Sequence, residues 1–136
     1  MDLLYFALMV GTGVCLFMSL RTLFVPNRMR GGNFLSLENF LYLGMVYFTV
    51  LVGFGMVYLI FGLYAEPVIT EANGNGGVSF LQKAGMAVYF SAMTLFSVGH
   101  GDVVPLGAGR FIAILEALVG YTIPAAFVAR AVLERE

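Results

Sequence analysis

The segment from Ser97 to Asp102, Ser-Val-Gly-His-Gly-Asp, has a residue pattern that suits ion binding through the backbone. Glycine stands at positions 99 and 101, and glycine accepts backbone angles that other residues avoid. A chain that alternates in this way can aim successive carbonyl oxygens to one side. Four such strands around an axis would form stacked rings of oxygens, which can replace the water shell of a monovalent cation. The alternative is that both glycines only form a turn.

Glu116 is an ionisable residue within an apolar stretch that reaches from about residue 109 to 129. Carboxylates in such stretches usually face the bundle interior or water, and they usually matter for function. Glu116 follows Gly101 by 15 residues, which predicts a place behind or just below the segment that begins at Ser97. We expect structural support rather than ion binding; the simpler alternative is a protonated acid hydrogen-bonded to a neighbouring helix.

Gly120 and Pro124 follow Glu116 at spacings of four residues, which places the three near one helix face. Pro124 removes the backbone hydrogen bond to the carbonyl of Gly120. The pair therefore predicts a hinge or kink in this helix. Because glycine and proline are common in membrane helices, an ordinary packing role remains the alternative.

The amino-acid composition indicates whether these residues lie in a soluble protein or in a membrane. Of 136 residues, 60% are apolar and 11% are charged, and the mean hydropathy is +0.92, whereas an ordinary soluble domain has about 25% charged residues. A soluble enzyme is therefore nearly excluded. The net charge of −1 and the lack of a long basic run argue against nucleic-acid binding. One histidine and one cysteine leave little material for a metal site, and we expect no cofactor.

Three stretches are long enough to cross a membrane, which takes about 20 apolar residues for about 30 Å of hydrocarbon. They predict a single all-α membrane domain over 1–136 with an N-terminal helix at 3–24, an outer helix at 38–65 and an inner helix at 109–133. The aromatic residues of the 38–65 helix, Tyr47 and Tyr58 among them, are expected to form lipid-facing and packing surface.

A fourth apolar run, 84–101, is better explained as a segment that enters and leaves the membrane on one side. Ser79 and Gln82 have the spacing of a capping box, which predicts a helix over 79–96. The two glycines and the proline at 105 then make a poor continuation of that helix. With three full spans, the basic residues after the first and last helices share one side, the cytoplasm. These residues are Arg21, Arg28, Arg30, Arg130 and Arg135. A multi-pass plasma-membrane protein with its N-terminus outside and its C-terminus cytoplasmic is the prediction.

The run Ser-Val-Gly-His-Gly-Asp-Val-Val-Pro, preceded by a short helix between two spans, resembles the pore loop of potassium channels. The usual family pattern is T-V-G-Y-G-D with a proline shortly after, and the resemblance covers roughly 38–133. It looks like a prokaryotic channel of the two-transmembrane type with an extra N-terminal helix. The resemblance implies a homotetramer in the lipid bilayer that conducts potassium ions passively through a selectivity filter at 97–102.

The resemblance also assigns roles to residues of this chain. The filter positions are Ser97, Val98, Gly99, His100 and Gly101. The backbone carbonyls of the first four would bind K+. Asp102 would support the filter through a hydrogen bond to Tyr89 of the pore helix, and Thr94 and Glu116 are further support positions.

Departures from the family pattern leave other functions open. Ser97 replaces the usual threonine, His100 replaces a tyrosine, and Met93 stands where some members have a buried acid. One alternative is therefore a weakly selective monovalent cation channel, and another is a non-conducting subunit of a channel assembly. His100 also predicts a response to acidification. An enzyme is not expected, because the one histidine lies between two glycines and has no credible partner for catalysis.

Overall fold

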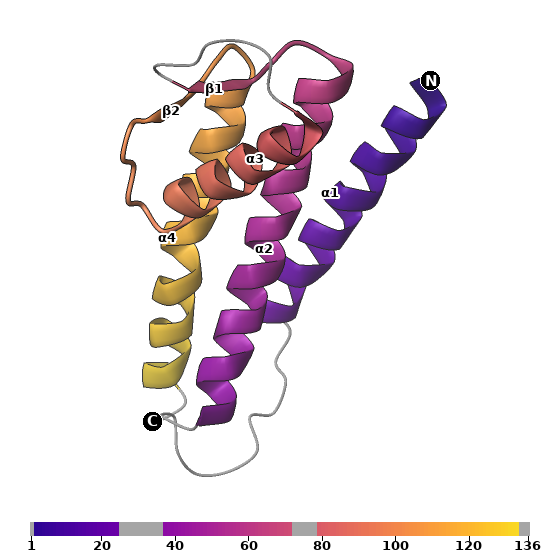
Figure 1. Ribbon diagram of the computed structural model, residues 1–136. Coiled ribbons are helices and arrows are strands. Elements are labelled where there is room, and N and C mark those ends of the chain that lie inside the picture. Colours follow the sequence, from indigo (N-terminus) through magenta and orange to yellow (C-terminus); the bar gives the residue numbers. More distant parts are fainter. Residues whose placement is uncertain (1, 25–36, 72–78, 134–136) are drawn as a thin grey trace.

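The computed structural model describes residues 2–24, 37–71 and 79–133, which form helices and one small sheet (Figure 1). The elements in chain order are α1 (Asp2–Phe24), α2 (Leu37–Tyr64), β1 (Ile69–Glu71), α3 (Phe80–Leu95), β2 (Val103–Pro105) and α4 (Gly109–Leu133). The helices expected from the sequence begin and end within about two residues of these bounds.

Two of the helices are long and apolar enough to cross a membrane. These stretches are Phe40–Tyr64 of α2 and Gly109–Ala129 of α4. Only 17% of the most apolar 18-residue stretch of α4 is buried within the chain. Most of this helix is therefore free to contact lipid or other copies of the chain. In α1 the apolar stretch among the described residues is shorter, Leu3–Met18. The prediction that this helix also spans the membrane stays a prediction.

α2 and α4 run side by side, and α3 lies across their upper halves at a steep angle to both (Figure 1). α1 packs against α2 on the side away from the loop that follows α3 (Figure 1). Its Tyr5 ring contacts Phe61 and Tyr64 of α2, with ring centroids 6.3 and 5.7 Å apart. The buried core joins α2, α3 and α4. It includes Val46, Val50, Phe54, Tyr58, Ala87, Phe90, Leu95 and Ile123.

The start of α3 confirms the predicted capping box. The backbone N–H of Ser79 donates to the Gln82 side chain at 2.8 Å, and the N–H of Gln82 donates to the Ser79 hydroxyl at 3.4 Å. Both bonds satisfy N–H groups that a helix start leaves without partners. The helix itself covers Phe80–Leu95, with Ser79 and Phe96 as its caps.

The small antiparallel sheet was not predicted from the sequence. Its register pairs Ile69 with Pro105, Thr70 with Val104 and Glu71 with Val103. The N–H of Leu106 extends this contact by donating to the carbonyl of Val68 at 2.7 Å. The sheet therefore joins the segment after α2 to the segment between the Ser97–Asp102 loop and α4.

The first described residues of α1 and the last of α4 lie at opposite ends of the molecule (Figure 1). Residues 25–36 between the first two helices, and most of the basic residues used to orient the chain, Arg28, Arg30 and Arg135, lie outside the described residues. The orientation in the membrane therefore stays a prediction.

Candidate functional site

The Ser97–Asp102 loop follows directly on α3 and has an unusual backbone. Positive φ angles occur at alternate positions, 57° at Ser97, 56° at Gly99 and 79° at Gly101. Glycine adopts this left-handed region without a steric penalty, whereas a residue with a Cβ loses roughly 1–2 kcal/mol there. The alternation expected from the glycine spacing is thus present, and it begins two residues before Gly99, at Ser97.

The N–H groups of this loop fold back onto the end of α3. Ser97 donates to the carbonyl of Thr94 at 3.0 Å, and Val98 and Gly99 both donate to the carbonyl of Met93, at 2.9 and 3.2 Å. These bonds satisfy carbonyls that a helix end leaves without partners. Within the described residues, none of the carbonyls from Ser97 to Gly101 accepts a hydrogen bond, and all of these residues are exposed. Their oxygens are therefore open to a ligand outside the chain.

Asp102 is held by two hydrogen bonds at the end of the loop. The Tyr89 hydroxyl donates to its Oδ2 atom at 2.8 Å, and the N–H of Val103 donates to Oδ1 at 3.1 Å. The hydrogen bond from Tyr89 is the main cause that lowers the pKa of the Asp102 carboxyl. The predicted contact between Asp102 and Tyr89 is confirmed; that it supports an ion filter stays a prediction.

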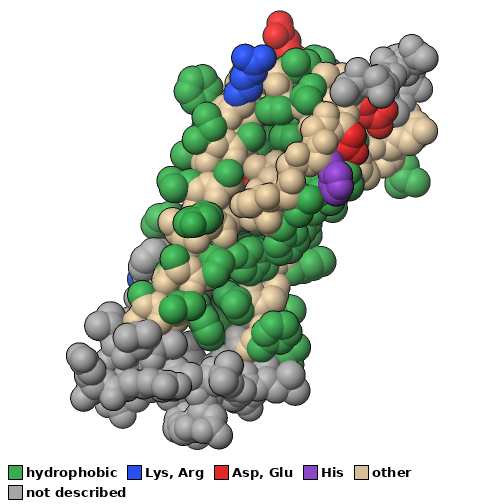
Figure 2. Space-filling view, turned by 90° about the vertical axis from the view of Figure 1, so that its left-hand side faces the viewer, with side chains coloured by type: hydrophobic (Ala, Val, Ile, Leu, Met, Phe, Trp, Pro, Cys, Tyr) green, Lys and Arg blue, Asp and Glu red, His purple; other side chains and the backbone are tan. Residues whose placement is uncertain are grey.

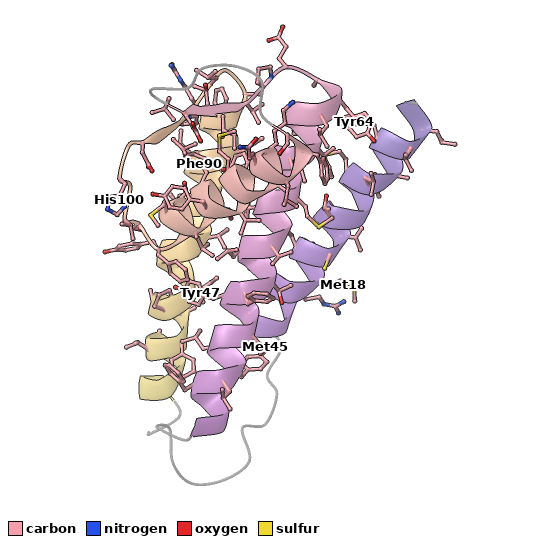
Figure 3. All side chains as sticks on the ribbon, in the orientation of Figure 1. Met18, Met45, Tyr47, Tyr64, Phe90 and His100 are labelled. Carbon is pink, nitrogen blue, oxygen red and sulfur yellow. The ribbon has the colours of Figure 1, made fainter. Side chains whose placement is uncertain are left out.

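The side chain of His100 points away from α2 and lies at the molecular surface (Figure 3). Its Nδ1 atom is 3.3 Å from the sulfur of Met93. In the view onto this face, the histidine lies beside acidic side chains, and hydrophobic side chains cover the surface below it (Figure 2). The imidazole of His100 is thus in contact with a neutral thioether sulfur.

Glu116 is completely buried, and it is hydrogen-bonded to Tyr58 of α2 and Ser91 of α3; its expected place behind the loop stays a prediction. The Tyr58 hydroxyl donates to Oε2 of Glu116 at 2.7 Å, and the Ser91 hydroxyl is hydrogen-bonded to Oε1. Ser91 Oγ also lies 2.9 Å from the carbonyl oxygen of Leu51. We call Tyr58, Ser91 and Glu116 the Glu116 cluster. Because its members come from α2, α3 and α4, the cluster joins the crossing helix to both of its neighbours.

Gly120 is in close contact with two other helices. A Cβ atom at Gly120 would lie 2.1 Å from the carbonyl oxygen of Leu95, so the missing side chain lets α4 approach the end of α3. The carbonyl of Gly120 accepts a hydrogen bond of 2.9 Å from the Tyr47 hydroxyl. This is the carbonyl that Pro124, inside α4, leaves without a helical partner. The structure thus gives both residues a packing role, while their predicted role as a gating hinge stays a prediction.

An open cavity of about 770 Å³ lies below the start of the loop, between α2, α4 and the end of α3. Tyr47 borders it, with its ring stacked on Phe96 at a centroid distance of 5.5 Å (Figure 3). The lining residues also include Ser97, Gly120, Tyr121, Pro124 and Val128.

Three residues of this region were missed by the sequence reasoning. Tyr47 and Tyr58 were predicted to be lipid-facing or packing surface, and Ser91 was given no role. Both rings do pack in or against the core, and their hydroxyls also form the hydrogen bonds to Gly120 and Glu116, which were not expected. A signal was present in the sequence, because a buried carboxyl and a proline-freed carbonyl both need partners. The sequence did not say which helix supplies them.

A short helix and an exposed loop with open carbonyls, inserted between two helices able to span a membrane, define a pore-loop membrane protein. Comparison with known proteins agrees: a family described as "Ion channel" matches residues 46–133, well over half of the chain. The chain therefore belongs to this ion channel family and is a membrane protein. The matched residues include α2, α3 and α4 from Val46 onward, and α1 lies outside them.

Two curated relatives carry the same name. The chain is 42% identical to Protein LctB of Bacillus caldotenax over 107 residues, which are 79% of this chain and 80% of that protein. It is also 42% identical to Protein LctB of Geobacillus stearothermophilus over 102 residues, 75% of this chain and 76% of that protein. No solved structure shows a significant match.

Proposed function

We propose that this chain forms a potassium-selective channel that conducts passively through a homotetrameric pore in the plasma membrane. The observation that carries the proposal is the run of carbonyls from Ser97 to Gly101, which are exposed and accept no hydrogen bond within the described residues. The N–H groups of Ser97, Val98 and Gly99 donate instead to carbonyls of α3. Such carbonyls suit a cation that has lost its water shell. No cofactor is needed, since the permeant ion is the ligand.

Several copies are needed to close a ring of carbonyl oxygens, and the number of four is what the resemblance to the potassium-channel pore loop implies. One chain supplies one carbonyl at each level, whereas an ion that loses its water needs a closed ring of them. The face that would meet other copies or lipid is apolar. Its exposed large side chains on α4 are Phe111, Ile114, Leu115, Leu118, Tyr121 and Val128.

The ion ligands in this proposal are the backbone carbonyls of Ser97, Val98, Gly99 and His100, with the Ser97 hydroxyl at the inner end. Asp102, at the other end of the loop, has a lowered pKa and so keeps its negative charge. Such a charge near the outer mouth raises the local concentration of cations. The Asp102–Tyr89 bond holds the last residue of the loop against α3.

A weakly selective monovalent cation channel is the second candidate. Ser97 is a residue with a Cβ that adopts a positive φ angle, which costs roughly 1–2 kcal/mol. His100, in place of the usual tyrosine, also changes the side chain beside the carbonyl rings, and its Nδ1 atom lies 3.3 Å from the Met93 sulfur. A non-conducting subunit of a channel assembly is the third possibility, and only a flux measurement distinguishes it.

The test uses purified protein in liposomes with potassium inside and sodium outside. A selective pore gives potassium flux and a reversal potential close to the potassium equilibrium potential. A reversal potential near zero would favour the weakly selective channel, and absence of flux would favour the non-conducting subunit. Chemical cross-linking of the same sample should give products up to the tetramer. Products that end at the dimer while flux persists would contradict the proposed assembly.

A further inference from the structure

The Glu116 cluster contains more short contacts than its oxygens can make without an added proton. From this geometry we infer that Glu116 is a neutral, protonated carboxylic acid, and that its proton completes a directed chain of hydrogen bonds from Tyr58 to the backbone of α2. The assignment rests on the contacts alone. Its consequence for ion selectivity rests on the function proposed above.

The hydrogen atom of Ser91 decides the assignment. Ser91 has one hydroxyl hydrogen, yet its Oγ atom is in hydrogen-bond contact with both the Leu51 carbonyl and Glu116 Oε1. A backbone carbonyl oxygen only accepts, so the contact with Leu51 takes the hydrogen of Ser91. The contact between Ser91 and Glu116 then needs a hydrogen from the other side. The carboxyl oxygen Oε1 must carry it.

With that proton in place, every hydrogen in the cluster has one acceptor. The Tyr58 hydroxyl donates to Glu116 Oε2, Glu116 Oε1 donates to Ser91, and Ser91 donates to the Leu51 carbonyl. The chain of bonds runs from α2 to α4, then to α3, and back to α2. No buried side-chain polar atom among the described residues lacks a partner.

The charged alternative leaves the cluster incomplete. A carboxylate at this place would be fully buried with two hydroxyl donors, and no ion pair with a lysine or arginine forms within the described residues. Burying such an anion is strongly unfavourable unless it is paired. The 2.9 Å contact between Ser91 and the Leu51 carbonyl would also be without a hydrogen.

The neutral acid therefore acts as a positioning group for α3. Ser91 lies six residues before Ser97 on the helix whose last carbonyls hold the loop. A carboxyl that both accepts from Tyr58 and donates to Ser91 fixes the depth and rotation of α3 between α2 and α4. Loss of the proton would remove one bond of the chain and place an unpaired buried charge against α3.

Infrared spectroscopy tests the proton directly and does not depend on conduction. Wild-type protein at neutral pH should show the C=O stretching band of a buried protonated carboxyl, which the difference spectrum against Glu116→Gln removes. Glu71→Gln, at an exposed position of β1, is the matched control and should leave the band unchanged. Ser91→Ala, if Glu116→Gln does not fold, should shift the band by removing its acceptor. A band that appears in wild type only after acidification would overturn the assignment.

Flux measurements test the consequence. A glutamine at 116 can accept from Tyr58 and donate to Ser91 as the neutral acid does, so Glu116→Gln should keep tetramers and wild-type selectivity. Glu116→Leu removes both bonds and should lose potassium selectivity. Loss in both variants would contradict the neutral acid. If wild-type protein conducts nothing while the infrared band is present, the proposed function fails and the proton assignment stands.

Discussion

Replacing Gly120 with alanine should damage the contact between α4 and the end of α3. The added Cβ atom would lie 2.1 Å from the Leu95 carbonyl oxygen and 3.0 Å from its carbon, and Cβ atoms essentially never come closer than 3.0 Å to another heavy atom. The neighbour is backbone and cannot rotate away. Either α3 or α4 must move by about 1 Å to restore an ordinary contact.

The magnitude follows from two opposing effects. Alanine is favoured over glycine inside a helix by about 1 kcal/mol. Forcing an extra methyl group into a packed contact costs typically about 1–3 kcal/mol. Gly44 is the matched control, because it lies in α2 and a Cβ there meets nothing within 4 Å. Gly120→Ala should therefore be less stable than Gly44→Ala by about 1–3 kcal/mol per chain.

The assay is unfolding of purified protein in detergent micelles with increasing denaturing detergent, followed by circular dichroism. Potassium flux is measured in parallel, because Leu95 is two residues before Ser97 and its displacement should reach the loop. Gly120→Ala should unfold at a lower detergent fraction than Gly44→Ala and conduct less selectively. Equal stability of the two variants would refute the close contact and leave Gly120 as a hinge only.

Three further predictions concern the loop. Gly99→Ala or Gly101→Ala places a Cβ at a positive φ angle, which costs roughly 1–2 kcal/mol per residue, and should abolish selective flux. Gly85→Ala on α3, where a Cβ meets nothing within 4 Å, is the control and should keep it. Selective flux in the loop variants would show that the alternation is not needed. Tyr89→Phe removes the main cause of the lowered Asp102 pKa. Because the stability that the ionised carboxyl contributes is lost as pH falls through that pKa, the pH midpoint of acid unfolding should be higher in the variant. An unchanged midpoint would argue against the hydrogen bond between Tyr89 and Asp102. His100→Tyr introduces the residue of the usual family pattern and should keep potassium selectivity; loss of selective flux in this variant would argue against position 100 as a filter position.

The helices could be predicted from the sequence because their signal is local. Long apolar runs gave α2 and α4, although the run of α4 contains Arg110 and Glu116, and the Ser79–Gln82 pair gave the start of α3. The sheet could not be predicted, because its strands are three residues each and the paired residues are more than 30 positions apart. Strands that short have no periodicity to detect, and only the folded chain brings them together.

The candidate site could be predicted where the type of a single residue indicates both its role and its backbone or burial state. The glycines at 99 and 101 predicted the alternating backbone angles, and Glu116 predicted a buried polar contact. Its partners, Tyr58 and Ser91, could not be predicted, because the sequence does not show which polar residues of the other helices lie at the same depth as Glu116. Ser97 was also not recognised as a left-handed residue, since nothing in a serine indicates it.

The Ser97–Asp102 loop is anchored at both ends within one chain, by α3 at its start and by Tyr89 and the β1–β2 pair at its end. The conformational entropy of this segment is thus lost when a single chain folds, before any copies meet. In the proposed homotetramer, association of copies would then join chains whose loops are already ordered, which loses less conformational freedom than association coupled to ordering. Variants that release one anchor should therefore still associate, but the rings they form would differ in geometry from copy to copy.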